Sequence, residues 1–118
     1  LRLLRERLAT RRFLSARGLA EQPDRALARM AGLVTCRQRP GTASGVVFVT
    51  LEDETGLANI VIYGRLADRQ RRELLGARLL GVLGQVQREG EVVHLVAGRL
   101  VDLSMWLGAL ETVSRDFH

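Results

Sequence analysis

The residue types that carry most enzyme chemistry are sparse in this sequence. It has two histidines, His94 and His118, and a single cysteine, Cys36. Their separation matches no zinc-ligand spacing, and a lone cysteine cannot form an internal disulfide. The loop from Pro40 to Gly45 lacks the lysine and the following helix of a phosphate-binding loop. We therefore expect no catalytic residue, no metal site and no cofactor in this chain.

The stretch from Gly45 to Tyr63 carries side chains suited to a different task, the binding of a nucleic-acid strand. Aromatic rings stack on bases, hydroxyl and amide groups hydrogen-bond to base edges, and guanidinium groups pair with phosphate oxygens. The candidate site comprises the rings of Phe48 and Tyr63, the polar groups of Thr50 and Asn59, and the guanidinium groups of Arg37, Arg39 and Arg88.

Two predicted strands, Gly45 to Glu52 and Leu57 to Tyr63, would position this site. The turn between them ends in Gly56, which adopts positive φ at little steric cost. Because side chains alternate along a strand, each strand has two faces. One face is purely aliphatic and is predicted to form the core: Val47, Val49 and Leu51 with Ala58, Ile60 and Ile62. The opposite face then presents Phe48, Thr50 and Asn59.

Each of these assignments has a plainer alternative. If the two faces are reversed, Phe48 fills the core. Tyr63 could equally pack on the core or cap it. The arginines could form an ordinary solvated rim, since charged side chains are mostly exposed.

The rest of the chain supplies the elements of a small barrel. Amphipathic spacing predicts a helix over residues 1–12, and Ser15 could cap a short turn to Glu21. Further strands are predicted at 27–39, with a bend or bulge at Gly32, and at 78–87 and 92–101. A helix is predicted at 66–75, with Leu66, Leu74 and Leu75 as anchors and Gly76 beyond its end, and a helical turn at 102–110.

This order of elements predicts a mainly β fold, the five-stranded OB-fold, a Greek-key barrel with a helix between its third and fourth strands. An open α+β sheet is the competing architecture. The short helical segments at the two ends would flank the barrel.

Composition sets broader limits on function. The chain has 118 residues, 47% of them hydrophobic, which suffices for one domain with a core. Its net charge is +5, and all 18 basic residues are arginine, which codon bias in a GC-rich genome would also explain. We expect an acidic partner, a cytoplasmic location and no membrane segment. Because it begins with Leu1, we expect the chain to be part of a longer protein.

Several of these residues also form a family motif. Gly45, Phe48, Leu51, Asp53 and Gly56 match G-x-x-F-x-x-L-x-D-x-x-G. This pattern resembles nucleic-acid-binding OB domains, including the anticodon domains of class II aminoacyl-tRNA synthetases, in which the residues matching Phe48 and Asn59 meet bases. Residues 30–118, including the terminal SRDFH, resemble the C-terminal end of bacterial error-prone DNA polymerase alpha subunits of the C family.

The second resemblance implies a domain plan and a function. Residues 1–27 would connect to a preceding domain, 28–102 would form the OB-fold domain, and 103–118 would form a helical turn and tail. The polymerase active site would lie upstream, and this module would bind single-stranded DNA during translesion synthesis, DNA repair and SOS mutagenesis. Other domains of the parent polymerase and mutasome accessory proteins are the implied protein partners. A protein-interaction module, using the first helix or the tail, and a tRNA-binding domain remain alternatives.

Overall fold

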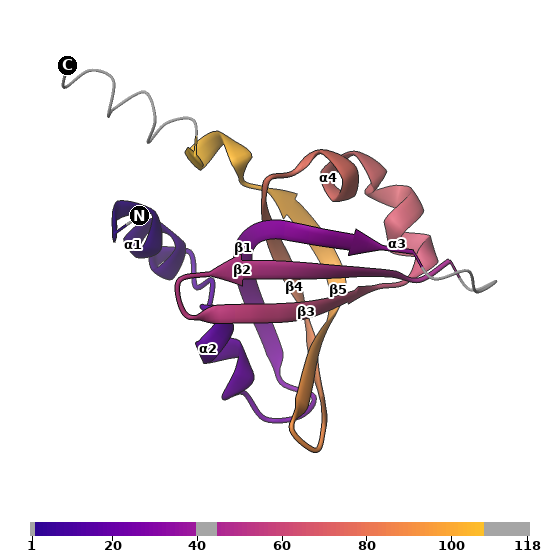
Figure 1. The fold of residues 1–118 in the computed structure, drawn as a ribbon, viewed down its shortest axis with the longest axis horizontal. Helices are drawn as coiled ribbons and strands as arrows, with labels where there is room; N and C mark the ends of the chain where they lie inside the picture. Colours follow the sequence, from indigo (N-terminus) through magenta and orange to yellow (C-terminus); the bar gives the residue numbers. More distant parts are fainter. Residues whose placement is uncertain (1, 40–44, 108–118) are drawn as a thin grey trace.

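The computed structural model describes residues 2–39 and 45–107 and alternates short helices with long strands (Figure 1). The elements in chain order are α1 (Arg2–Thr10), α2 (Ala16–Ala20), β1 (Leu27–Gln38), β2 (Val47–Asp53), β3 (Gly56–Ile62), α3 (Gly64–Arg69), α4 (Arg71–Gly76), β4 (Leu79–Glu89) and β5 (Val92–Asp102). The predicted loop at 40–44, Leu110 and the tail from Ser114 lie outside the described residues.

The strands close into a barrel in the order β1-β2-β3-β5-β4. All neighbouring pairs are antiparallel except β3 and β5, which run parallel. The long β1 pairs with β4 along its first half and with β2 along its second half, so it belongs to both sides of the barrel. This topology confirms the predicted OB-fold barrel over the open sheet.

The aliphatic alternation in β2 and β3 fills the barrel as predicted. Val49, Leu51 and Ile60 are at most 1% exposed, and all six residues of the predicted inward face belong to one buried cluster. Burying an aliphatic side chain of this size contributes about 1.5–3 kcal/mol, so the inward set fixes which face points to solvent.

Helices cover both ends of the barrel. At one end α2 inserts Ala16 and Leu19 into the main core, although these residues lie in the segment predicted as a connector. Ser15 caps α2 as predicted, its hydroxyl accepting a hydrogen bond from the Gly18 N–H. At the other end, α3 and α4 contribute Ala67 and Leu74.

The single helix predicted over 66–75 is wrong in one respect, because the chain breaks at Gln70 into α3 and α4. The Gln70 side chain donates to the Leu100 carbonyl oxygen at 2.8 Å and accepts from the Leu100 N–H at 2.7 Å. This pair of bonds ties the helical break to β5. Leu75, a predicted anchor, is 56% exposed, and Gly76 ends α4 rather than following it.

Two irregularities bend the long strands, and neither lies at Gly32. The β1–β2 register shifts between Val34 and Cys36, and the β4–β5 register shifts between Leu83 and Gly84. Gly32 instead permits a close approach, since a Cβ there would lie 3.0 Å from the Glu52 carbonyl oxygen.

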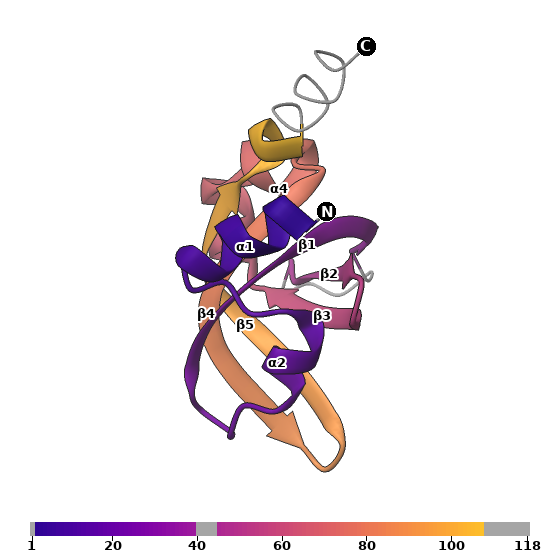
Figure 2. The ribbon, with the colours of Figure 1, turned by 90° about the vertical axis from the view of Figure 1, so that its left-hand side faces the viewer.

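A second apolar cluster lies outside the barrel, where α1 packs across β1 and β4 (Figure 2). Its buried members are Leu4, Leu8, Phe13, Ala31, Leu79 and Leu103. Trp106 and Leu107, in the helical turn at 104–107, pack against this cluster. The described part of the C-terminal segment therefore packs Leu103, Trp106 and Leu107 against the barrel flank and α1.

Candidate nucleic-acid interface

The outward face of the β2–β3 hairpin gathers the candidate base-contacting residues. Thr50 lies directly opposite Asn59, and Phe48 lies opposite Val61. Phe48 is 40% exposed, whereas its neighbours Val47 and Val49 are buried. Residues opposite one another in a ladder share a face, with Cβ atoms roughly 5 Å apart. The hairpin thus places an exposed ring beside a hydroxyl and an amide.

The barrel extends this face onto strands that sequence reasoning did not connect with it. His94 of β5 lies next to Asn59 through the parallel β3–β5 pairing, and Cys36 of β1 lies opposite Thr50. Gln87 of β4 lies opposite His94. Alternation could have shown that His94 points outward, because Leu95 beside it is buried. The result is a continuous outward row, Cys36–Thr50–Asn59–His94–Gln87, which we call the polar row.

Tyr63 and Arg39 lie at one edge of this face. Tyr63 follows β3 in extended conformation, on the same side of the chain as Asn59 and Val61, and is 51% exposed. Arg39 follows β1 and is exposed, with no hydrogen bond or ion pair to another described residue. At the opposite edge stands the exposed carboxylate of Glu52. The face therefore carries a positive charge at the Arg39 edge and a negative charge at the Glu52 edge.

Arg37 and Arg88 are placed differently from the other five candidate residues. The Arg37 guanidinium donates to the Leu74 and Ala77 carbonyl oxygens, both at 2.6 Å, at the end of α4. Cations are favourable there because the helix dipole is negative at its C-terminus. The Arg88 guanidinium donates to the carbonyl oxygens of Ala20, the last residue of α2, and of Gln22. A phosphate would have to compete with these bonds for either side chain.

The motif residue Asp53 fastens the N-terminal segment to the hairpin. One carboxylate oxygen accepts from the Ala16 N–H at 2.7 Å and from Arg5 at 3.2 Å, and the other accepts from the backbone and hydroxyl of Thr55. Its side chain is only 5% exposed. Burial opposes ionisation, but the Thr55 and Ala16 hydrogen bonds and the Arg5 charge outweigh it and hold the pKa of Asp53 below its ordinary value.

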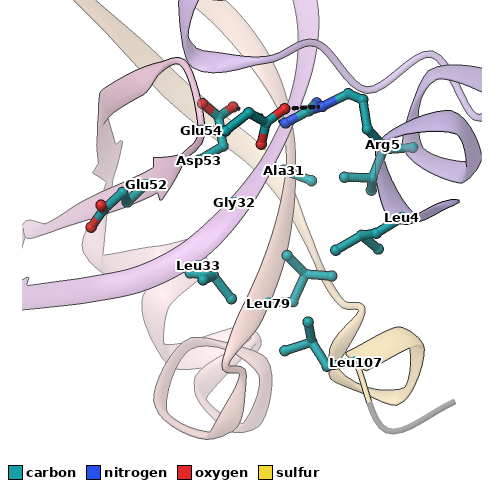
Figure 3. Close-up of a pocket in the computed structure, with 11 residues that line it drawn as sticks. Leu4, Arg5, Ala31, Gly32, Leu33, Glu52, Asp53, Glu54, Leu79 and Leu107 are labelled. Atoms are coloured by element: carbon teal, nitrogen blue, oxygen red, sulfur yellow. Dashed lines mark hydrogen bonds and ion pairs between the residues drawn. The ribbon is translucent and has the colours of Figure 1, made fainter. Parts of the chain in front are cut away.

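Glu54 completes this attachment from the tip of the turn. It accepts a hydrogen bond from Arg5 Nε at 2.6 Å (Figure 3). This bond lowers the pKa of Glu54 and raises that of Arg5. Below the carboxylates, Leu4, Leu33, Leu79 and Leu107 surround an apolar pocket of about 310 Å³ (Figure 3). The pocket lies on the barrel flank and does not include the polar row.

The described part of the chain offers no candidate metal cluster and no candidate membrane span. Its His, Cys, Asp and Glu side chains form no group of three that could hold a metal ion. None of its helices has both the length and the apolar character needed to cross a bilayer.

A comparison with known protein families agrees with the barrel fold. Residues 28–103 match the family described as "OB-fold nucleic acid binding domain". The chain therefore belongs to this family of nucleic-acid-binding barrels.

Comparison with individual proteins adds named relatives to the family match. Over all 118 residues the chain is 74% identical to an error-prone DNA polymerase of Azoarcus sp. (strain BH72) and 66% identical to that of Dechloromonas aromatica (strain RCB). It spans only 11% and 12% of the length of these curated relatives. The predicted resemblance to error-prone DNA polymerases is thus confirmed, for a small region of such proteins.

Solved structures share the fold at low sequence identity. Asparaginyl-tRNA synthetase from Pyrococcus horikoshii superposes with a TM-score of 0.63 at 18% identity, covering 77% of this chain and 23% of the synthetase chain. An OBody bound to hen egg-white lysozyme superposes with a TM-score of 0.55 at 16% identity, covering 68% of this chain and 80% of the OBody.

Proposed function

We propose that this chain is a single-stranded DNA-binding module of an error-prone DNA polymerase that acts in translesion synthesis and DNA repair. The observation that carries the proposal is the exposed ring of Phe48 on a strand whose other face is wholly buried. An aromatic side chain that lies outside both buried clusters and is 40% exposed is available for stacking, which accepts any base because every base has a π face.

In this proposal, the single-stranded DNA crosses β2 and β3 along the polar row. One base stacks on Phe48, and Thr50 and Asn59 hydrogen-bond to a neighbouring base edge. Phosphates lie toward Arg39, since Glu52 at the other edge repels them. Tyr63, on the Arg39 side, offers a second ring. Arg37 and Arg88 keep their hydrogen bonds to backbone carbonyl oxygens and take no part in binding phosphate.

Binding to labelled oligonucleotides tests this function. The chain is titrated by fluorescence anisotropy into a deoxythymidine oligomer of about 12 nucleotides, which exceeds the footprint of many OB-folds. We expect weak binding that falls steeply with salt, with a log–log slope of about −0.7 for each phosphate neutralised. Absence of binding even at low salt would contradict the proposal and favour a protein-interaction module.

A uridine oligomer of the same length distinguishes the tRNA-binding alternative. The two sugars differ in the 2′-hydroxyl, which proteins use to tell RNA from DNA. Equal or weaker binding of RNA supports the DNA-binding module. A marked preference for RNA would make tRNA binding the better account of the same face.

A further inference from the structure

A second basic surface lies on the side of the barrel formed by the first half of β1 together with β4 and β5. Figure 2 shows β4 on one side of the barrel and β2 and β3 on the other. Here a shallow hollow of about 610 Å³ lies beside the end of α1. Its charged lining consists of Arg12, Arg29 and Arg99, and no described residue that lines it is acidic.

Strand register brings two of these arginines together. Leu83 of β4 lies opposite Arg29 on one side and opposite Arg99 on the other, so the three residues form one outward row across β1, β4 and β5. The row spans two inter-strand spacings, roughly 10 Å between the outer Cα atoms.

A bulge is what turns Arg99 outward. Leu83 pairs with Arg99 and Gly84 with Ala97, which leaves Gly98 without a partner on β4. Ala97 and Leu100 both face the core, so the extra residue between them reverses the alternation and places Arg99 on the solvent side. Bulges commonly change the direction in which a side chain points, and this one places Arg99 in the same outward row as Arg29.

The three arginines are free to take a ligand. All are exposed, and their guanidinium groups form no hydrogen bond or ion pair with any other described residue. Elsewhere in the described chain, Arg5, Arg37 and Arg88 are held by carboxylates or carbonyl oxygens. Unpaired guanidinium groups from β1, β5 and the segment after α1 line an acid-free hollow. Such groups match a run of phosphates, which they bind bidentately.

We propose that this surface, the Arg12–Arg29–Arg99 hollow, binds the phosphate backbone of a nucleic acid, separately from the Phe48 face. Leu27, 84% exposed at the edge of the hollow, adds apolar surface for a sugar or base. The barrel would then contact nucleic acid on two sides, reading bases across β2–β3 and holding phosphates across β1–β4–β5.

The test compares two double variants that each remove two positive charges. Arg29→Gln with Arg99→Gln alters the hollow, whereas Arg69→Gln with Arg72→Gln alters exposed arginines of α3 and α4. Both are titrated into a deoxythymidine oligomer of about 30 nucleotides, long enough to reach more than one side of the barrel. We expect the hollow variant to bind roughly tenfold more weakly at low salt and to reduce the slope magnitude by about 1.4, or 0.7 for each contact. The control should lose less than half as much.

Additional variants keep the result interpretable. Arg29→Lys with Arg99→Lys retains both charges and should keep the wild-type slope while losing part of the affinity. Should the double glutamine variant melt early, each single variant should lower the slope magnitude by about 0.7. Equal losses in the hollow and control variants would overturn the proposal and leave this surface to an acidic protein partner. Phe48→Ala is measured in parallel to distinguish the two faces. If one face does not bind nucleic acid, variants of the other face should still weaken binding.

Discussion

Asp53 accepts a hydrogen bond from the backbone N–H of Ala16, joining the tip of the β2–β3 hairpin to the first residue of α2 across 2.7 Å. The same carboxylate accepts from Arg5 and Thr55, so one buried side chain connects α1, α2 and the hairpin turn. The N-terminal helices are held to the barrel by this residue as well as by apolar packing.

Replacing Asp53 should therefore destabilise the chain. Asp53→Ala leaves several donors without a partner and should lower the free energy of unfolding by about 2–3 kcal/mol in denaturant melts. Glu54→Ala serves as the matched control, because its half-exposed ion pair with Arg5 is worth less than about 1 kcal/mol. Equal losses in the two variants would show that Asp53 does not have this special role.

Acid should weaken the same attachment. Because the folded state holds the pKa of Asp53 below its ordinary value of 3.8, ionised Asp53 contributes stability that is complete above that value. The contribution is lost as pH falls below 3.8 and through the folded-state pKa. Melts at pH 7 and about pH 3 should show a larger drop for wild type than for Asp53→Asn. Equal losses of stability in wild type and Asp53→Asn would contradict the assignment of this pH dependence to Asp53.

The two hydrogen bonds between Gln70 and Leu100 should make a measurable contribution to the free energy of unfolding. Gln70→Met keeps the length of the side chain but loses both hydrogen bonds to Leu100, which should cost about 1–3 kcal/mol of unfolding free energy. Gln87→Met, on the exposed surface of β4, should change stability by less than about 0.5 kcal/mol. If the Gln70 variant is as stable as the Gln87 variant, the helical break has another cause.

The C-terminal segment should contribute to stability through Leu103. This side chain is 7% exposed within the second cluster, so Leu103→Ala should cost about 2–4 kcal/mol. Met105, two residues away and 83% exposed, provides the control, and Met105→Ala should be nearly neutral. Deleting the residues after Asp102 should lower the melting midpoint as well. An unchanged midpoint would mean that the segment docks elsewhere.

The sequence alone predicts the structural features that depend on residues close together in the chain. The alternation of Val47, Val49 and Leu51 predicted the inward face of β2, and with it the exposure of Phe48. Helix capping by Ser15 is predictable because the cap and its partner Gly18 are only three positions apart.

Long-range contacts account for what sequence could not predict. The break at Gln70 is hydrogen-bonded to Leu100, thirty residues away, and Arg37 meets the end of α4 about forty residues on. His94 joins the polar row only because β3 and β5 pair in parallel when the barrel closes. No local pattern carries that register.

The most direct test of the DNA-binding account is the paired measurement of binding and stability in Phe48→Ala, with Phe48→Leu as the control that keeps apolar bulk without an aromatic face. Both are titrated into the deoxythymidine oligomer and melted in denaturant. The account predicts that Phe48→Ala loses about 1–3 kcal/mol of binding free energy, the range for one base–aromatic stack, and little unfolding free energy. Phe48→Leu should also bind weakly and melt like wild type. Wild-type binding by Phe48→Ala, or a stability loss of about 3–5 kcal/mol as for a core phenylalanine, would contradict it.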